Sequence, residues 1–325
     1  MSMTKILFLT KGSYDASARE RVLNYFRFFK KDGFYTSHYG LSGSLLNYIK
    51  ALLSAPFSDV VFLQRKLLPT VYFYLLRLLS KKIVYDFDDS VFLNSDGSQS
   101  ISKNKRFKMI CKYSDIIFAG NEFLRKKALK FNQNTIIIPT CLDTTKYKEV
   151  KNKLTKFYDL VWVGQKSTSK YLKKIIPYLE QASMKENKIR LVNISNIKIR
   201  SPILKIKNIT WAESSQYKYI SSSHIGIAPL DKNDWSKGKC AFKVLQYAAA
   251  GIPILSSDVG VNSKLINKYQ PGMLVKNDQE WCSHILKMIN NKKLFTFYKK
   301  NSLRMAADYD IEKNYNILKI VLKKL

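Results

Sequence analysis

Short apolar runs typical of buried β-strands alternate with amphipathic helical segments along this chain of 325 residues. The runs are nearly continuous in apolar residues, which is typical of parallel strands whose two faces are both covered by helices. The expected strands form a first series at residues 6–9, 60–63, 83–85, 116–119 and 135–138, and a second series at 160–163, 191–194, 209–212, 225–228, 254–256 and 273–275. Two such series predict an α/β protein with two parallel sheets.

The two series predict two Rossmann-like domains, which suits the chain length at about 150 residues per domain. We expect an N-terminal domain at 1–150 and a C-terminal domain at 151–310, with the joint in the charged stretch 144–158. No expected strand follows the last two helices, at 292–308 and 311–325. The final helix is therefore expected to pack back toward the N-terminal domain.

The chain is strongly basic, with 56 Lys and Arg against 24 Asp and Glu and a formal net charge of +32. Both halves contribute, since residues 1–150 hold 24 basic and 12 acidic residues and residues 151–325 hold 32 and 12. Such a charge favours polyanionic surroundings, either nucleic acid or the anionic cytoplasmic leaflet of a membrane. A Lys- and Asn-rich bias of the whole proteome is an equally simple explanation.

Four cysteines lie far apart and form no Cys-x-x-Cys pair, which argues against a zinc site or a disulfide framework and favours a reducing compartment. The start, MSMTKILFLT, is expected to be a first buried strand rather than a signal segment. No uncharged run reaches transmembrane length. We therefore expect a soluble or peripheral protein that is cytoplasmic, at the inner face of the cell membrane.

The stretch KCAFKVLQYAAAGIPILSSDVG at 239–260 combines a helix, a Gly-Pro break and a short buried strand. We expect Lys239 and Lys243, four positions apart, to share one face of the first turn of this helix. The helix macrodipole is already positive at that end and disfavours cations there. Two lysines at this place therefore predict a bound anion.

Both expected domains open with a turn that contains Gly and Ser between a strand and a helix. The turns are TKGSYDAS at 10–17 and VGQKSTS at 163–169. Exposed backbone N–H groups and the positive end of the following helix suit phosphate. Neither turn has the glycine spacing of a dinucleotide fingerprint or a P-loop, so an ordinary strand-to-helix turn is the alternative.

Several stretches together resemble the family 4 glycosyltransferases, which are retaining enzymes of the GT-B fold. The most specific stretch is HIGIAPLDKNDWSKGKCAFKVLQYAAAGIPILSSDVG at 224–260. Supporting stretches are VWVGQKST at 161–168, SARERV at 17–22, DVVFLQRK at 59–66 and VYDFDDSVF at 84–92. The likeness is greatest to a bacterial branch that assembles surface polysaccharides. It implies two Rossmann-like domains that face each other across a cleft, with the donor nucleotide held mostly by the C-terminal domain.

The resemblance also implies which residues hold the donor. Lys243 and Lys239 would neutralise the donor diphosphate as the glycosidic bond breaks. The implied nucleotide-sugar ligands are Gly12, Ser13, Gly164, Ser167, Thr168, Lys170, Gln246, Val259 and Gly260. Base contacts are expected from 209–213. The donor is expected to be a UDP-, GDP- or dTDP-sugar, used without a cofactor and without a bound metal.

Three carboxylates, Asp86, Asp88 and Asp89, stand at the carboxyl end of an expected strand, where open α/β sheets bind ligands. We expect one or two of them to face the cleft and hold acceptor hydroxyls, and we count Asp86 among the catalytic residues. A capped loop that carries surface carboxylates is the alternative. Arg19 and Arg21 are expected to hold a phosphate of donor or acceptor, with plain surface arginines as the alternative.

The chain departs from the family pattern at two pairs of positions. Many members carry two glutamates eight positions apart, where this chain has Gly238 and Gln246. Gln246 can still bind ribose hydroxyls, whereas Gly238 cannot take over a contact to the sugar. Many members also have Arg and Lys where this chain has Gln165 and Lys170. A family member that has lost catalysis and serves as a scaffold is therefore one alternative.

The stretch LLPTVYFYLLRLLSKK at 67–82 is apolar nearly all round and ends in cations. We expect a helix that is buried between the sheet and its neighbours. An interfacial segment on an anionic leaflet is the alternative. Membrane association is expected from the general positive charge rather than from this helix.

These patterns lead to the expectation of a retaining glycosyltransferase, of hexosyltransferase type. It would move a sugar from a nucleotide-diphosphate sugar to a glycan or lipid-linked glycan acceptor in surface polysaccharide biosynthesis. Peripheral contact with an anionic membrane is expected, and no specific nucleic acid. The alternatives are a sugar-nucleotide epimerase or hydrolase of the same fold, and a basic nucleic-acid-binding protein.

Overall fold

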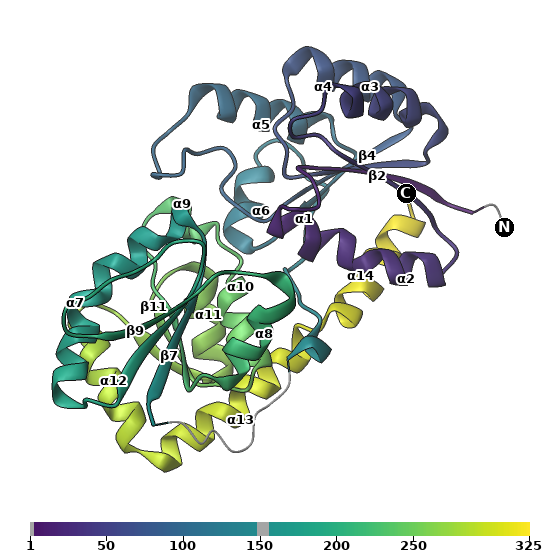
Figure 1. The fold of residues 1–325 in the computed structure, drawn as a ribbon. Helices are drawn as coiled ribbons and strands as arrows, with labels where there is room; N and C mark the ends of the chain where they lie inside the picture. Colours follow the sequence, from purple (N-terminus) through teal and green to yellow (C-terminus); the bar gives the residue numbers. More distant parts are fainter. Residues whose placement is uncertain (1–2, 148–155) are drawn as a thin grey trace. The chain divides into compact units, whose positions relative to one another are not determined.

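The computed structural model describes residues 3–147 and 156–325, so much of the expected joint at 144–158 lies outside the described residues. The chain divides into two compact units, which are described separately (Figure 1). The first unit comprises Met1–Cys141, Asn233–Cys240 and Ile311–Leu325. The second unit comprises Leu142–Lys232 and Ala241–Asp310. A short segment from the middle of the C-terminal half therefore belongs to the first unit, together with the last helix.

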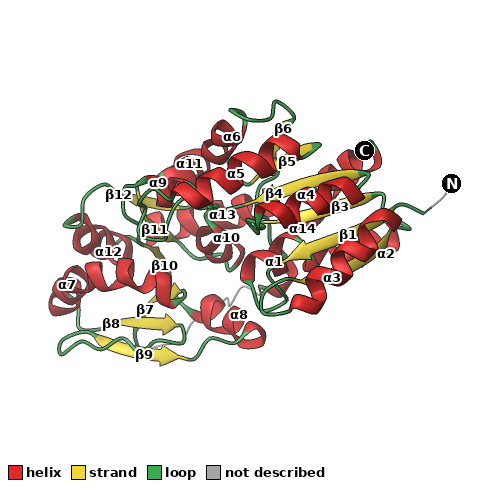
Figure 2. Ribbon diagram, turned by 90° about the horizontal axis from the view of Figure 1, so that it is seen from above, coloured by secondary structure: helices red, strands yellow, loops and turns green. Residues whose placement is uncertain are grey.

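The first unit is built on a parallel six-stranded sheet with the strand order β2-β1-β3-β4-β5-β6 (Figure 2). Its strands are β1 (Lys5–Thr10), β2 (Tyr35–Gly40), β3 (Val60–Gln64), β4 (Lys82–Phe87), β5 (Ile116–Ala119) and β6 (Thr135–Ile137). Neighbouring strands run in register with buried, nearly continuous apolar sequences such as VVFLQ in β3. This is the pattern of a sheet that is covered on both faces.

Helices cover both faces of the first sheet. They are α1 (Ala16–Arg21), α2 (Phe26–Lys31), α3 (Leu45–Ser54), α4 (Thr70–Leu79), α5 (Ile101–Tyr113), α6 (Glu122–Ala128) and α14 (Ile311–Lys323), with 3-10 turns η1 (Leu23–Tyr25) and η2 (Ala55–Phe57). One core joins the sheet to α3, α4, α5 and α6, and another joins it to α2 and α14. Figure 1 shows α3 and α4 on the side of this sheet opposite to α2 and α14.

Polar contacts fix α14 in the first unit. Asn314 donates through Nδ2 to the hydroxyl of Tyr25 at 2.8 Å, and Tyr315 donates through its hydroxyl to Oδ2 of Asp32 at 2.6 Å. The Tyr315 ring also stacks on Phe28, with 5.1 Å between the ring centres. The last helix is thus bound by its buried face to the N-terminal part of the chain.

The second unit is built on another parallel six-stranded sheet, in the order β12-β11-β10-β7-β8-β9. Its strands are β7 (Tyr158–Val163), β8 (Ile189–Ile194), β9 (Lys205–Ile209), β10 (Ile225–Ala228), β11 (Ile254–Ser257) and β12 (Gly272–Val275). Its helices are α7 (Ser169–Lys185), α8 (Glu213–Ser222), α10 (Phe242–Ala249), α11 (Gly260–Tyr269), α12 (Glu280–Asn290) and α13 (Lys292–Asp308), with 3-10 turns η3 (Thr144–Lys146) and η4 (Lys166–Thr168). Two cores lie on its two faces. The remaining short helix, α9 (Asp234–Lys237), belongs to the first unit.

The predicted α/β fold with two parallel sheets is confirmed, but two strands differ from the expectation. Strand β2, with the sequence YTSHYG, was not expected, and the strand expected at 209–212 is instead β9 at Lys205–Ile209. Both strands lie at an edge of their sheet and are largely half-buried or exposed. An edge strand has one partner and needs no continuous apolar run, so the apolar pattern that reveals central strands is missing.

The helix expected at 67–82 is also different from the expectation. It forms α4, which buries Phe73 and Leu76 against the sheet but leaves Val71 73% and Leu78 83% exposed. The expectation of a helix buried between the sheet and its neighbours therefore holds for one side of α4 only. Among the described residues, no helix combines the length and the apolar character needed to cross a membrane.

Candidate functional site

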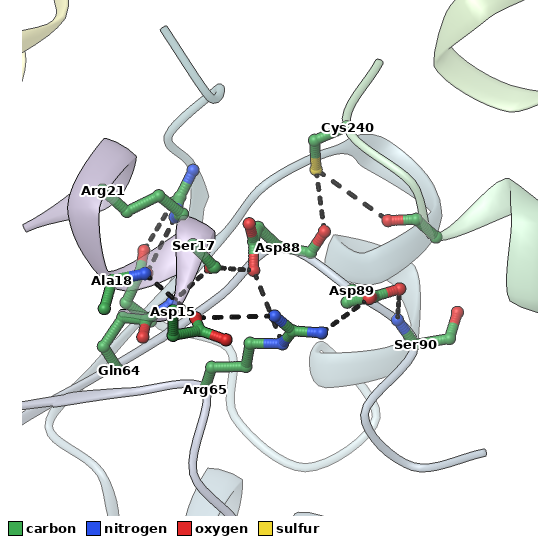
Figure 3. A network of polar contacts seen from close by, with 12 residues as sticks. Asp15, Ser17, Ala18, Arg21, Gln64, Arg65, Asp88, Asp89, Ser90 and Cys240 are labelled. Atoms are coloured by element: carbon green, nitrogen blue, oxygen red, sulfur yellow. Dashed lines mark hydrogen bonds and ion pairs between the residues drawn. The ribbon is translucent and has the colours of Figure 1, made fainter. Parts of the chain in front are cut away.

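Polar side chains gather where β1, β3, β4 and β5 end in the first unit (Figure 3). The strands are parallel, so the loops that follow them meet along one edge of the sheet, where open α/β sheets bind ligands. The residues expected to bind acceptor and part of those expected to bind donor lie on these loops.

Arg21, the last residue of α1, and Asp86, near the end of β4, form a buried ion pair. The guanidinium donates through Nε to Oδ2 of Asp86 at 2.8 Å and through Nη2 to Oδ1, and it also donates to Oγ1 of Thr140 at 3.1 Å. Burial is the largest single influence and lowers the pKa of Arg21, but the charge and hydrogen bonds of Asp86, together with the charge of Asp88, raise this pKa above its ordinary value.

This ion pair bears on the roles expected of Arg21 and Asp86. Only 3% of the Arg21 side chain and 2% of the Asp86 side chain are exposed. Each side chain is paired with the other and is buried, which argues against the catalytic role expected of Asp86 and the phosphate-binding role expected of Arg21. A buried Arg–carboxylate pair of this kind fixes α1 against β4.

Arg65 follows β3 and lies among three carboxylates (Figure 3). Its Nη2 donates to Oδ2 of Asp89 at 2.8 Å, and other nitrogens of the guanidinium lie 3.8 Å from Oδ1 of Asp15 and 4.0 Å from Oδ1 of Asp88. Burial lowers the pKa of Arg65, but the three carboxylates together raise it. Its φ of +60° is a left-handed conformation that residues with side chains rarely adopt. Strained backbone of this kind persists where surrounding contacts hold it and is often found at functional sites.

A short chain of hydrogen bonds orients Asp88. Its Oδ1 accepts from the Ser17 hydroxyl at 2.6 Å, and the Ser17 hydroxyl accepts from Nε2 of Gln64 at 2.6 Å. Gln64 is fully buried at the end of β3, and its Oε1 has no hydrogen-bond partner among the described residues. The expected acceptor ligands Asp88 and Asp89 are thus brought together and held in fixed orientations, with a small exposed area on each side chain.

The segment Asn233–Cys240 docks on the same edge. Nζ of Lys239 donates to Oδ2 of Asp89 at 2.8 Å, and the Cys240 thiol donates to the backbone carbonyl of Asp88 at 3.2 Å. Nδ2 of Asn121, in the loop after β5, donates to the carbonyl of Gly238 at 3.1 Å. Asp89 therefore forms ion pairs with two cations, Arg65 and Lys239, which come from two different parts of the chain.

Two glycines allow this close docking. A Cβ added at Gly238 would lie 2.1 Å from Oγ of Ser90, and one added at Gly120 would lie 2.4 Å from Sγ of Cys240. Gly238 stands where the resemblance places a glutamate in many family members. In this chain the position is packed against Ser90 and has no room for a side chain.

The expected shared helix face of Lys239 and Lys243 is not formed. Ala241 adopts a left-handed conformation with φ +57°, so α10 begins only at Phe242. Lys239 lies before this break and belongs to the first unit, whereas Lys243 lies in the first turn of α10 in the second unit. The expectation is wrong because residues 239–241 are irregular rather than the start of the helix.

Lys243 lies at the carboxyl edge of the second sheet, since α10 follows β10. Its Nζ lies 5.8 Å from the ring centre of Trp162, which is buried in β7. The first turn of α10 contains no Asp or Glu. Gly164 makes room for the ring, because a Cβ at this position would lie 2.3 Å from Trp162. A cation is thus held at a positive helix end by an aromatic face, an arrangement that suits an anionic ligand.

Some polar side chains of the turn after β7 form hydrogen bonds within the turn itself. The Thr168 hydroxyl donates to the carbonyl of Gln165 at 3.1 Å and accepts from the Gln165 N–H at 3.2 Å. Ser167 is exposed, and Nζ of Lys170 lies 5.1 Å from the ring centre of Tyr171. Thr168 therefore stabilises the turn, while Ser167 and Lys170 reach solvent.

Gln246 is buried on α10, within a polar cluster under the end of the sheet. Its Nε2 donates to the Tyr147 hydroxyl at 3.0 Å and to Oε1 of Gln216 at 3.3 Å, and Nε1 of Trp211 donates to the same oxygen at 3.1 Å. Both hydrogens of the Gln246 amide group thus have protein acceptors. Trp211 comes from the 209–213 stretch where base contacts were expected.

The start of α11 lies, like Lys243, at the carboxyl edge of the second sheet. Gly260 has φ +59°, which glycine adopts without strain, and Val259 caps the helix with no side-chain hydrogen bond. The first N–H groups of a helix have no partner within the helix. Here they follow the end of β11, on the same edge as Lys243, and they are suitable donors for phosphate oxygens.

The turn after β1 holds the remaining expected donor ligands. Gly12 has φ +140°, and its N–H donates to Oγ1 of Thr10 at 3.0 Å, while Ser13 is exposed. Nη1 of Arg19 donates to the carbonyls of Tyr14 at 2.9 Å and Ser13 at 3.3 Å. Arg19 thus braces this turn from within α1.

Sequence reasoning missed several members of the first edge, notably Arg65, Gln64 and Ser17. Gln64 and Arg65 directly follow an expected strand, and that strand neighbours the one that carries Asp86. The position after a strand end was the signal that could have found them. Among residues 3–147 and 156–325, no cluster of His, Cys, Asp and Glu side chains is arranged to hold a metal ion.

Residues 158–291 match the family model described as "Glycosyl transferases group 1". The matched stretch contains Lys243, Gln246 and the start of α11, and it leaves out the whole first sheet. A search of curated proteins found no match to the chain.

Solved structures show the same fold over nearly the whole chain. HepE from Anabaena, in complex with UDP and glucose, is 12% identical with a TM-score of 0.77, covering 99% of this chain and 100% of that chain. Sucrose-phosphate synthase from Thermosynechococcus elongatus is 11% identical with a TM-score of 0.76, covering 99% and 98%. A glycosyltransferase from Rickettsia africae is 12% identical with a TM-score of 0.72, covering 100% and 99%. The fold is GT-B, and the family match supports a glycosyltransferase.

Proposed function

We propose that this protein is a retaining glycosyltransferase, of hexosyltransferase type, that transfers a sugar from a nucleotide-diphosphate sugar to a glycan or lipid-linked glycan. Its setting would be surface polysaccharide biosynthesis at the inner face of the cell membrane. The observation that carries the proposal is the edge of the second sheet, where Lys243 and the uncapped start of α11 lie within the matched residues 158–291.

The donor would bind with its diphosphate at this edge. The N–H groups at the start of α11 would donate to phosphate oxygens, and Nζ of Lys243 would neutralise the charge that develops on the diphosphate as the glycosidic bond breaks. Trp162 supports this lysine by its buried ring, at 5.8 Å from Nζ to the ring centre. The neighbouring HepE has been solved in complex with UDP and with UDP-glucose, which favours a uridine donor.

Retention would follow from front-side transfer. The acceptor hydroxyl attacks the anomeric carbon on the face that the diphosphate leaves, and the departing phosphate oxygen takes the hydroxyl proton. No strong protein base is needed for this step, which suits a chain whose Asp86 carboxylate is buried and paired with Arg21. Asp88 and Asp89 are the proposed acceptor ligands, oriented by Ser17 and Arg65.

The glutamate that many family members use near the sugar has no counterpart at Gly238. This position is closed by Ser90, so contacts to the donor sugar must come from other groups. This is the reason to test transfer directly rather than to infer it from nucleotide binding alone.

The test has two stages. A thermal-shift screen with UDP, GDP, dTDP, ADP and CMP is expected to show stabilisation by one nucleoside diphosphate, because a ligand that binds only the folded state raises its stability. Product analysis with the matching nucleotide sugars then separates transfer from the alternatives. Release of free sugar or of an epimerised donor without any acceptor product would identify a hydrolase or epimerase of the same fold. Stabilisation by single-stranded RNA and by no nucleotide would contradict the proposal.

A further inference from the structure

An apolar surface lies on the outer side of α3, η2 and α4. Ten of the 22 exposed large hydrophobic side chains of the described residues lie between residues 45 and 79, and we call these ten side chains the apolar face. The most exposed of them include Leu53, Phe57, Val71 and Leu78. An exposed apolar surface that is continuous over neighbouring elements marks a site of interaction with a partner or a membrane.

Helical spacing directs the apolar face outward. In α4, Val71, Leu75 and Leu78 are exposed at positions i, i+4 and i+7, whereas Phe73 and Leu76 point into the core. The helix is therefore apolar on its solvent side as well as on its buried side. A helix at the surface of a protein in water ordinarily carries polar residues on its outer side.

The neighbouring helix continues the apolar face. In α3, Leu46, Ile49 and Leu53 are exposed at i, i+3 and i+7. Tyr72 of α4 donates through its hydroxyl to the carbonyl of Tyr48 in α3 at 2.8 Å, and the two rings meet edge to face at 4.8 Å. The two outward stripes thus lie on helices that contact each other. Figure 1 shows these two helices side by side.

The helix next to this face is rich in cations. Helix α5 packs beside α4 through Tyr74 and Tyr113, whose ring centres lie 5.5 Å apart. It carries five Lys and Arg and no Asp or Glu in its sequence ISKNKRFKMICKY. Lys50 projects from α3 as a further exposed cation, and Asp59 is the one acidic residue in the stretch 45–79.

We propose that the apolar face is a docking surface for an anionic lipid bilayer. Interfacial helices lie in the plane of the membrane with apolar side chains among the acyl chains and with Lys and Arg at the headgroups. A second copy of the chain fits the surface poorly, because a two-fold contact would bring the cation-rich helices of two chains of charge +32 together.

The position of the face suits a lipid-linked acceptor, and this part rests on the proposed function. Helices α3 and α4 begin after the carboxyl ends of β2 and β3, so Leu46 and Val71 lie toward the sheet edge that carries Arg65 and Asp88. Docking on the bilayer would bring this edge close to the headgroups, where a lipid-linked sugar is presented.

Vesicle flotation tests the docking surface. Wild-type protein is expected to float with vesicles of phosphatidylcholine and phosphatidylglycerol at 7:3 and to float weakly with phosphatidylcholine alone. The double variant Leu75→Ser/Leu78→Ser should bind the anionic vesicles at least tenfold more weakly. The matched control is Met184→Ser/Ile203→Ser, which removes two exposed apolar side chains of the second unit and should bind like wild type.

A charge-reversed pair of variants tests the cation-rich helix. Lys105→Glu/Arg106→Glu on α5 should weaken vesicle binding by several-fold. The control, Lys292→Glu/Lys293→Glu on α13, changes the net charge by the same amount and should weaken vesicle binding much less. Equal losses from both variants would mean attraction by net charge alone and would overturn the docking surface.

Two further outcomes would also overturn it. One is that the Leu75→Ser/Leu78→Ser variant binds anionic vesicles as strongly as the wild-type protein does. The other is that wild-type protein forms a stable dimer in light scattering and does not bind vesicles, while the Leu75→Ser/Leu78→Ser variant is a monomer. That result would assign the face to a second copy of the chain. Circular dichroism and the nucleotide thermal shift are measured on every variant. A variant that is folded and binds nucleotide but not vesicles separates failure of docking from failure of the proposed activity.

Discussion

The carboxyl edges of the two sheets differ in how their charged groups are paired. At the edge of the first sheet, cations and carboxylates satisfy one another, as Arg21 does with Asp86 and as Arg65 and Lys239 do with Asp89. At the edge of the second sheet, Lys243 and the uncapped start of α11 present positive groups, and the first turn of α10 holds no carboxylate. The comparison indicates that the charges at the first edge pair with one another and hold its loops in place, whereas the positive groups at the second edge lie where open α/β sheets bind ligands.

Breaking the buried pair of the first unit should have the largest effect on stability. Arg21→Met leaves Asp86 buried and unpaired, which costs about 3–5 kcal/mol in other proteins. Urea denaturation should show this loss, and the double variant Arg21→Met/Asp86→Leu should recover most of it. A loss below about 1 kcal/mol for Arg21→Met would mean that this pair does not fix the edge.

Removing the cation of the second edge should affect turnover rather than stability. Lys243→Ala is expected to lower turnover a hundredfold or more, roughly 3 kcal/mol of transition-state stabilisation, because the leaving diphosphate loses its counter-charge. Lys185→Ala, at the far end of α7, is the matched control and should be fully active. Near-normal turnover of a folded Lys243→Ala variant would remove the basis of the proposed chemistry.

The docking of Asn233–Cys240 on the first unit can be weakened by adding a single methyl group. Gly238→Ala places a Cβ 2.1 Å from Oγ of Ser90, and overpacking of this kind costs about 1–3 kcal/mol. Adding Ser90→Gly should restore part of the loss, as measured by thermal denaturation of both variants. No loss in Gly238→Ala would show that this contact yields easily and that a larger residue could be accommodated there.

The smallest effect is expected at the start of α11. Gly260→Ala forces a side chain into a left-handed conformation, at a cost of about 1 kcal/mol, and Gly260→Asn should cost less because asparagine tolerates this conformation. Nucleotide affinity measured on both variants reports whether the start of this helix matters for binding. Equal stability of the alanine and asparagine variants would argue against strain at this position.

The sequence predicted the fold well because most strands are central. Apolar runs such as those of β3 and β7 are buried on both faces and are visible without any alignment. The edge strand β2 was not predicted and β9 was predicted at the wrong residues, because half-exposed strands carry polar residues. The exposed side of α4 was foreseen only as the alternative to a buried helix, since a helix that is apolar nearly all round is ordinarily buried.

The candidate site could be predicted only in part. Asp88, Asp89 and Lys243 were predicted from their places at strand and helix ends, and Gly260 was predicted from the family resemblance. The pairing of Asp86 with Arg21 and of Asp89 with Lys239 joins residues 65 and 150 positions apart, and no local pattern encodes such pairs. The left-handed Ala241, which separates Lys239 from α10, follows from tertiary docking rather than from residue preference.

The most direct test of the account compares the two lysines. Affinity for the nucleoside diphosphate that gives the largest thermal shift is measured by calorimetry for wild type, Lys243→Ala and Lys239→Ala. The account predicts a loss of at least tenfold for Lys243→Ala and a change within about threefold for Lys239→Ala, whose charge is used by Asp89. Unchanged affinity in Lys243→Ala, or an equal loss in both variants, would contradict a diphosphate site at the edge of the second sheet.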